Sequence, residues 1–353
     1  MSDKSDIRAE ANRLQSLFEA RGAEVFETDI LQPAGALLDL YGEDIRARAF
    51  VTQDPLRGEM MLRPDFTVPL VQRHMQGARG EARYAYAGEV FRRQEADPER
   101  KAEYLQVGFE LFNGPAAHEA DAEVFATIAR ILAPLGLRAA IGDIGLLRAA
   151  VDGLNTSEAR KSALLHHLWR PGRFRSLLGQ FCEAKRVASP IAPSGAAAEV
   201  GLRTRAEVEA RLAALASDQQ TPPLDSTAVD AIDALLSVRD KAPMAVTHLT
   251  DIAKDLPAIR DRVTTLSRRF DALGALDVDV DQLDFEGSYG RTSLEYYDGF
   301  VFGFYADARP DLPPVATGGR YDALTRAIGG GRGVPAVGGV IRPGLTTLLG
   351  GAP

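Results

Sequence analysis

The stretch YLQVGFELF at residues 104–112 combines groups that could bind a small charged molecule. Successive side chains of a β-strand point to opposite faces, so its even positions place Gln106, Gly108 and Glu110 together. An amide and a carboxylate can accept hydrogen bonds from an ammonium group, and a glycine leaves room for a ligand to approach the backbone. The odd positions form an unbroken apolar row for packing against helices, which consists of Leu105, Val107, Phe109 and Leu111.

A second stretch, EYYDGFVFGFYA at residues 295–306, shows the same division between two faces. Either strand alone is more simply interpreted as part of an amphipathic sheet with one solvated face. Two such strands together favour the floor of a ligand pocket on a sheet. One face carries Phe300, Phe302 and Phe304, and the other carries Tyr297, Gly299, Val301 and Gly303.

Two arginines near a turn supply positive charge, opposite to that of the Glu110 carboxylate. Arg92 lies near the end of a strand and Arg100 in the loop that follows it, within RRQEADPERK. Guanidinium groups hold carboxylates or phosphates through paired donors, although a solvated hairpin tip also accounts for this segment. In LRPDFTVPL, Asp65 and Thr67 are two residues apart, so in an extended chain they face the same side. Asp65 could cap the helix that follows or, at a different moment, face a ligand.

The composition is that of an ordinary globular protein, with 353 residues, 45% of them hydrophobic and 25% charged. The formal net charge of -8 provides no global positive field for nucleic acid. A single cysteine, Cys182, excludes an intramolecular disulfide and a Cys-based metal cluster. The sequence shows neither a signal-like start nor a run of about 18 apolar residues. We therefore expect a cytoplasmic protein with no metal centre, nucleic-acid partner or membrane segment.

The elements that must position these side chains belong to an α+β fold. The β-like runs before and after a long helical region most economically form one mixed, mainly antiparallel sheet flanked by helices. The helical region is expected to be an insertion, because it is rich in Ala, Leu, Arg and Asp and has few β signals. The sequence predicts an opening helix at 6–21, hairpins within 49–63 and 82–114, a helix at 118–136, a strand at 137–145, the insertion at about 153–275 and a closing strand and helix within 334–350.

Five motifs resemble the catalytic domain of histidyl-tRNA synthetase, a class II aminoacyl-tRNA synthetase. The motifs are, in order, LRPDFTVPLVQ, EVFRRQEADPERKAEYLQVGFELF, LEYYDGFVF, GGRYDAL and PAVGGVIRPGL. The resemblance covers residues 1–150 and 280–350, and five ordered motifs are far more specific than any one. It implies a class II synthetase-like domain over 1–350, usually dimeric, with the helical insertion in the expected place.

The resemblance also implies roles for individual residues. The amino-acid pocket of the family falls on seven positions, with Arg92 matching the arginine that holds a carboxylate or α-phosphate. Tyr104 matches an aromatic residue that stacks adenine, Arg342 matches the motif-three arginine for ATP, and Arg100 is a further candidate for contact with a nucleotide or anion. The expected histidine-binding residues are Asp65, Thr67, Arg92, Gln106, Glu110, Tyr297 and Tyr321.

Three departures from the synthetase pattern change the expected function. The family has an arginine where TSLEYY begins, and this chain has Thr292 there. Losing one donor to a developing negative charge typically costs about 10²–10³ in rate, and losing a full cation could cost more. Asp65 stands where the family has glutamate. Eleven residues follow Arg342, too few for a folded anticodon-binding domain.

With these departures the chain is similar to the regulatory branch of the family, which works beside a short catalytic subunit of ATP phosphoribosyltransferase in the first step of histidine biosynthesis. The resemblance implies a non-catalytic, cofactor-free subunit that senses histidine for feedback regulation. It further implies a homodimer within a hetero-oligomer. Two alternatives stay open: an ATP-dependent amino-acid-activating enzyme without a tRNA-binding domain, and a scaffold with a relic pocket.

Overall fold

A nine-stranded mixed sheet dominates the part of the chain that the computed structural model describes, residues 3–35, 45–77, 80–94, 101–114, 116–183, 204–291 and 296–350. Neighbouring strands are antiparallel except for β1 with β5 and β7 with β9. The strands in spatial order are β1 (Glu24–Val25), β5 (Ala82–Phe91), β6 (Glu103–Phe112), β12 (Ala336–Ile341), β11 (Ala316–Arg320), β10 (Phe300–Tyr305), β7 (Arg138–Asp143), β9 (Asp284–Glu286) and β8 (Arg239–Lys241).

Strands from the two ends of the chain join in this sheet. Ile141 of β7 pairs with Phe302 of β10, and Phe109 of β6 pairs with Gly339 of β12. The prediction of one mainly antiparallel sheet is therefore confirmed. The other predicted hairpin also forms, but it lies in a separate three-stranded sheet that contains β2 (Leu31–Pro33), β3 (Val51–Asp54) and β4 (Gly58–Leu62).

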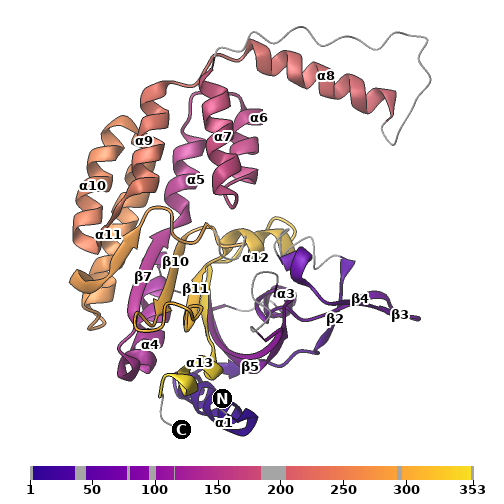
Figure 1. Cartoon of the computed structure of the whole chain (residues 1–353), viewed down its shortest axis with the longest axis vertical. Helices are drawn as coiled ribbons and strands as arrows, with labels where there is room; N and C mark the ends of the chain where they lie inside the picture. The colour runs from indigo at the N-terminus through magenta and orange to yellow at the C-terminus, as the bar shows by residue number, and fades with distance from the viewer. Residues whose placement is uncertain are drawn as a thin grey trace.

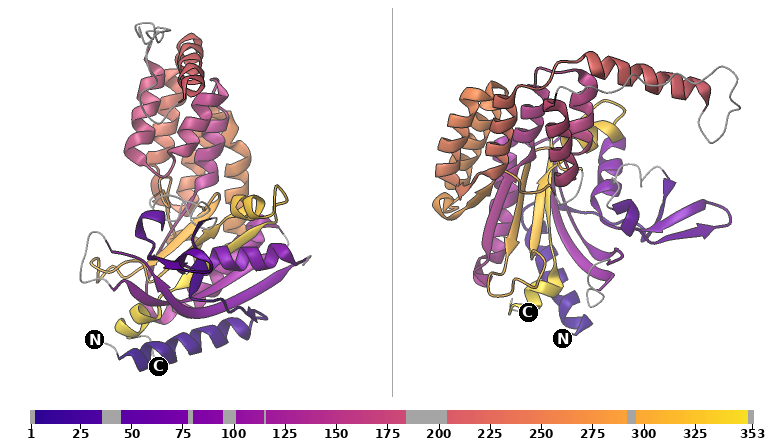
Figure 2. Two further views of the ribbon diagram at one scale, coloured as in Figure 1. Left: turned by 90° about the vertical axis from the view of Figure 1, so that its right-hand side faces the viewer. Right: turned by 45° about the horizontal axis from the view of Figure 1, so that its top comes forward.

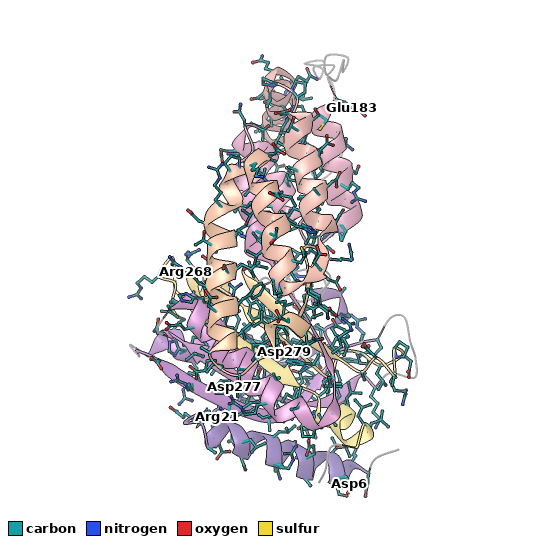
Figure 3. The ribbon with its side chains drawn as sticks, turned by 90° about the vertical axis from the view of Figure 1, so that its left-hand side faces the viewer. Asp6, Arg21, Glu183, Arg268, Asp277 and Asp279 are labelled. Atoms are coloured by element: carbon teal, nitrogen blue, oxygen red, sulfur yellow. The ribbon has the colours of Figure 1, made fainter. Side chains whose placement is uncertain are left out.

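Helices cover one face of the large sheet with the predicted apolar rows. The helix α1 (Lys4–Glu19) stacks Phe18 on Phe109 of β6, with ring centroids 5.2 Å apart. Figure 3 shows this helix beneath the sheet, between Asp6 and Arg21. The helix α4 (Ala117–Leu132) places Phe125 against the rings of Phe300, Phe302 and Phe304 at centroid distances of 5.2–6.2 Å.

Within the described ranges, the opposite face is covered only in part, by α3 (Thr67–Gln76) and α12 (Asp322–Ile328). His74 of α3 stacks on Phe112 of β6 at 4.2 Å. The short helix α13 (Pro343–Leu348) packs beside α1, and the two described ends of the chain lie close together (Figure 1).

A group of helices stands at one end of the sheet (Figure 1), and α8 projects away from the others in Figure 1 and in the right-hand view of Figure 2. No residue of α8 is buried. The predicted division into a synthetase-like domain and an insertion stays a prediction. None of the helices within the described ranges has the length and apolar character needed to cross a bilayer. The group of helices at the end of the sheet comprises α5 (Ile144–Asp152), α6 (Glu158–His166), α7 (Pro171–Cys182), α8 (Arg205–Gln220), α9 (Ser226–Ser237), α10 (Ala242–Asp255) and α11 (Arg260–Gly274).

A buried ion network ties these helices to the sheet. Asp121 of α4 is fully buried and accepts hydrogen bonds from Arg269 Nε of α11 at 2.8 Å and from Arg320 Nε of β11 at 2.9 Å. Arg269 Nη1 also donates to Asp143 Oδ2, at the end of β7, over 3.0 Å. Burying charge is costly unless the charges are paired, so these four groups depend on one another.

We expect Asp121→Ala to destabilise the fold strongly. The substitution leaves the guanidinium groups of Arg269 and Arg320 buried without their shared carboxylate, and loss of one partner of a buried pair typically costs about 3–5 kcal/mol. Urea unfolding at neutral pH measures this loss. The matched control is Glu123→Ala on the same helix, which breaks the partly exposed pair with Arg83 and should cost less than about 1 kcal/mol. Similar losses for both variants would contradict the structural role of the network.

Candidate functional site

A cavity of about 210 Å³ opens on the partly covered face of the sheet. The structure brings together around it all seven residues expected to bind histidine, and Arg342 with them. Tyr104 is half-buried but does not line the cavity, and Arg100 lies outside the described residues. The seven lining positions are Asp65, Thr67, Arg92, Gln106, Glu110, Tyr297 and Tyr321.

The ends of the surrounding elements place most of these side chains. Arg92 directly follows β5, Tyr321 lies between β11 and α12, and Arg342 lies between β12 and α13. Gln106 and Glu110 lie two alternations apart on β6 and therefore face the same side of the sheet. Side chains from segments far apart in the sequence thus meet because the central strands of the sheet are neighbours.

Glu110 lines the cavity, and hydroxyl groups donate hydrogen bonds to its carboxylate. Its Oε1 accepts hydrogen bonds from Tyr86 OH at 3.0 Å and Thr67 Oγ1 at 3.2 Å, and its Oε2 accepts one from Tyr321 OH at 2.6 Å. Burial raises the pKa of Glu110 to about 7, although the hydroxyl donors oppose this shift. The protonation state of this carboxyl group therefore changes near neutral pH.

Two glycines make this arrangement possible. A Cβ atom on Gly338 would fall 1.4 Å from Glu110 Oε2, so only glycine leaves space for that carboxylate. A Cβ atom on Gly108 would fall 2.0 Å from the Tyr86 ring. The expectation that Gly108 makes room for a ligand is therefore wrong, because Tyr86 occupies that space and donates to Glu110.

The two carboxylate oxygens of Asp65 meet different groups, one at the start of α3 and one beside the cavity, and its role toward a ligand stays a prediction. Its Oδ1 accepts the backbone N–H of Thr67 at 3.1 Å, at the start of α3. Its Oδ2 lies 3.4 Å from Tyr296 OH and 4.0 Å from Arg92 Nη2. One oxygen anchors the helix while the other meets groups around the cavity, so the two roles do not exclude each other.

The remaining polar groups give the cavity both acceptors and donors. Gln106 is buried, and its Oε1 has no hydrogen-bond partner among the described residues. Arg92 Nε donates to the carbonyl of Pro64 at 2.8 Å, and Arg342 Nη1 donates to the carbonyl of Pro314. Burial lowers the pKa of Arg342. An unpaired buried acceptor costs free energy, and a ligand with an N–H donor would remove that cost.

Sequence reasoning missed several lining residues, among them Arg48, Tyr289, Tyr296 and Thr317. Tyr296 could have been found, because it belongs to the same YY pair as Tyr297. Nothing in the sequence around Arg48 distinguishes it from the arginine two positions earlier, and only the fold brings it to the cavity.

Arg291 directly precedes Thr292, the position where the family has an arginine, and its side chain makes contacts outside the cavity. Arg291 Nε donates to the carbonyl of Leu168 at 2.8 Å, and its guanidinium lies 4.8 Å from the centre of the Phe174 ring. Arg291 lies in the turn that follows β9 (Asp284–Glu286) and does not line the cavity. Thr292 itself lies outside the described residues.

We expect the raised pKa of Glu110 to make stability depend on pH. Because the folded value of about 7 lies above the ordinary 4.5, the folded chain binds this proton more tightly. The contribution is complete below about pH 4.5 and is lost as the pH rises through about 7. Relative to Glu110→Gln, the parent protein without ligand should lose up to about 3 kcal/mol of unfolding free energy over this interval. Urea unfolding across the pH range tests this, and parallel profiles for the two proteins would contradict it.

Comparison with known proteins places the chain in a family. The family model described as histidyl-tRNA synthetase matches residues 2–190 and 191–343. The ATP phosphoribosyltransferase regulatory subunit of Rhizobium etli (strain CIAT 652) is 30% identical over 353 residues, which cover 92% of this chain and 93% of the relative. The subunit of the same name from Sinorhizobium fredii is 28% identical and covers 94% of this chain and 92% of the relative.

Solved structures show the same fold. An ATP phosphoribosyltransferase regulatory subunit/histidyl-tRNA synthetase from Bacillus halodurans superposes with a TM-score of 0.70 at 19% identity, covering 99% of this chain and 81% of that one. Histidyl-tRNA synthetase from Nostoc sp. PCC 7120 gives a TM-score of 0.65 at 16% identity, covering 99% of this chain and 72% of that one. The family model and the relative of 30% identity show that the chain belongs to the histidyl-tRNA synthetase family, in its group of ATP phosphoribosyltransferase regulatory subunits.

Proposed function

We propose that this chain is a non-catalytic subunit of ATP phosphoribosyltransferase and that its Glu110 cavity binds free histidine. In this proposal it acts beside a short catalytic subunit in the first step of histidine biosynthesis, as a homodimer within a hetero-oligomer. The names of the curated relatives support the regulatory role. The cavity supports the choice of ligand.

The observation that carries the proposal is that groups of opposite charge face one small cavity. Asp65 and Gln106 offer acceptors for an ammonium group, and Arg92 lies within 4.0 Å of Asp65 with donors for a carboxylate. An amino acid carries both of these charges on one carbon atom. The volume of about 210 Å³ lies below the roughly 300–1,000 Å³ of pockets for drug-sized ligands, which suits a small metabolite.

The aromatic wall suits the side chain of histidine. Tyr297 and Tyr321 are both buried, and Tyr321 OH already donates to Glu110. An imidazole between these rings can donate an N–H to one tyrosine hydroxyl or accept from it. Hydrogen bonds to charged groups contribute about 1.5–3 kcal/mol each, so a few of them suffice for micromolar affinity.

Feedback regulation follows from linkage between this cavity and the complex. If histidine binds more tightly to the inhibited arrangement, occupancy shifts the equilibrium by that difference in affinity alone. Couplings of this kind are typically about 1–3 kcal/mol. The proposal needs no chemical step in this chain.

We expect Gln106→Ala to weaken histidine binding about tenfold or more, because the variant removes the buried acceptor for the ammonium group. Titration calorimetry with free histidine measures the dissociation constants of the parent protein and the variant. Gln15→Ala on α1 is the control, since it changes the same side-chain type far from the cavity. No heat of binding in the parent protein would refute the histidine-sensor proposal.

Amino-acid activation is the second candidate, because Arg342, the counterpart of the family's ATP-binding arginine, lines the same cavity as Arg92. Histidine-dependent exchange of pyrophosphate into ATP separates the two functions. We expect no exchange above background from the purified chain, since position 292 lacks the family's cation. Appreciable exchange would favour the enzyme over the regulatory subunit.

A further inference from the structure

Tyr289 lies in the turn that follows β9 and bounds the cavity beside β10. A Cβ atom on Gly142 of β7 would fall 2.7 Å from Tyr289 Cβ, and a Cβ atom on Gly303 of β10 would fall 2.1 Å from Tyr289 OH. The hydroxyl oxygens of Tyr289 and Tyr305 are 2.8 Å apart and share a hydrogen bond. The Tyr289 side chain therefore lies across both strands, and only glycine at position 303 leaves room for its hydroxyl end.

Strand pairing shows how much of the floor of the cavity this side chain covers. Directly paired residues of neighbouring strands point to the same face of a sheet, and one row of such pairs runs from Gly303 on β10 to Gly108 on β6. Tyr289 covers Gly303 at one end of the row, and Tyr86 covers Gly108 at the other. The floor between the two tyrosines is therefore two strands wide. It consists of the paired residues Thr317 on β11 and Val340 on β12.

The proposed ligand would place its α-carbon over this row. Glu110 lies two residues from Gly108 in one direction along β6, and Gln106 lies two residues away in the other. In the proposed function, the imidazole lies near Glu110 and Gln106 holds the ammonium group. The carbon atoms between them then lie over the two-strand floor, which Tyr289 bounds. A group added to the main chain of the ligand on the side of β10 would meet the Tyr289 ring.

We propose that Tyr289 makes the cavity selective for free histidine over peptides that contain histidine. This inference rests on the proposed histidine function and adds the residue that limits the size of the ligand. A histidine dipeptide keeps the imidazole and one of the two charged main-chain groups of histidine, so polar contacts alone discriminate weakly against it. A ring in the path of the longer ligand adds a steric penalty that free histidine does not meet, because a filled site tolerates extra atoms poorly. A sensor of the free amino acid needs this distinction, since peptides carry the same side chain.

The test compares histidine with two dipeptides, glycyl-histidine, which extends the amino group, and histidyl-glycine, which extends the carboxyl group. The parent protein should bind both dipeptides at least about 100-fold more weakly than histidine. Tyr289→Ala should bind at least one of them about tenfold more tightly than the parent protein does, because removal of the ring uncovers the backbone of Gly142 and Gly303. Tyr289→Leu, which keeps part of the buried contact, should change dipeptide binding in the same direction by a smaller factor.

Tyr289→Phe is the matched control, since it keeps the ring and loses only the hydroxyl group. It should reject the dipeptides as the parent protein does, and a gain equal to that of Tyr289→Ala would overturn exclusion by the ring. Titration calorimetry gives all dissociation constants, and thermal unfolding shows whether each variant is folded. A dipeptide bound by the parent protein as tightly as histidine, or no gain for either dipeptide in folded Tyr289→Ala or Tyr289→Leu, would also overturn the role of Tyr289. Absence of histidine binding in the parent protein would instead refute the proposed function, before any variant is compared.

Discussion

The burial of one carboxyl group that hydroxyl groups hold, with no ion pair to it among the described residues, is the constraint on which the site depends. Three hydroxyl groups donate hydrogen bonds to the Glu110 carboxylate, and the fold must place each of them within reach of it. Tyr86 fits only because residue 108 is glycine, and the carboxylate fits only because residue 338 is glycine. The pairing of β5, β6 and β12 therefore sets the shape and the protonation of the cavity together.

The second set of buried charges connects this cavity to the helices. Asp121 joins Arg269 of α11 to Arg320 of β11, and Arg320 immediately precedes Tyr321, a donor to Glu110. The paired charges thus join α11 to the end of β11, and the next residue of the chain belongs to the wall of the cavity. Under the proposed function, these paired charges are one physical route by which occupancy of the cavity would bias the position of the helices.

Patterns in the sequence predicted many of the residues that line the cavity, because strand alternation depends only on the local sequence. Strand alternation fixes that Gln106 and Glu110 share a face, and the apolar rows on β6 and β10 do pack against α1 and α4. Gly108 shows the limit of this reasoning, since a pattern shows that space is needed but not which atoms fill it.

The sequence by itself determined the fold class, the family and the face of the sheet that carries the polar groups, because these follow from periodicity and from ordered motifs. Only the tertiary structure decided that Arg48 reaches the cavity, that Tyr86 fills the space above Gly108 and that Asp121 pairs with two arginines. Each of these contacts joins residues from separate segments. Such contacts depend on which strands become neighbours, and a single sequence does not encode that in any local pattern.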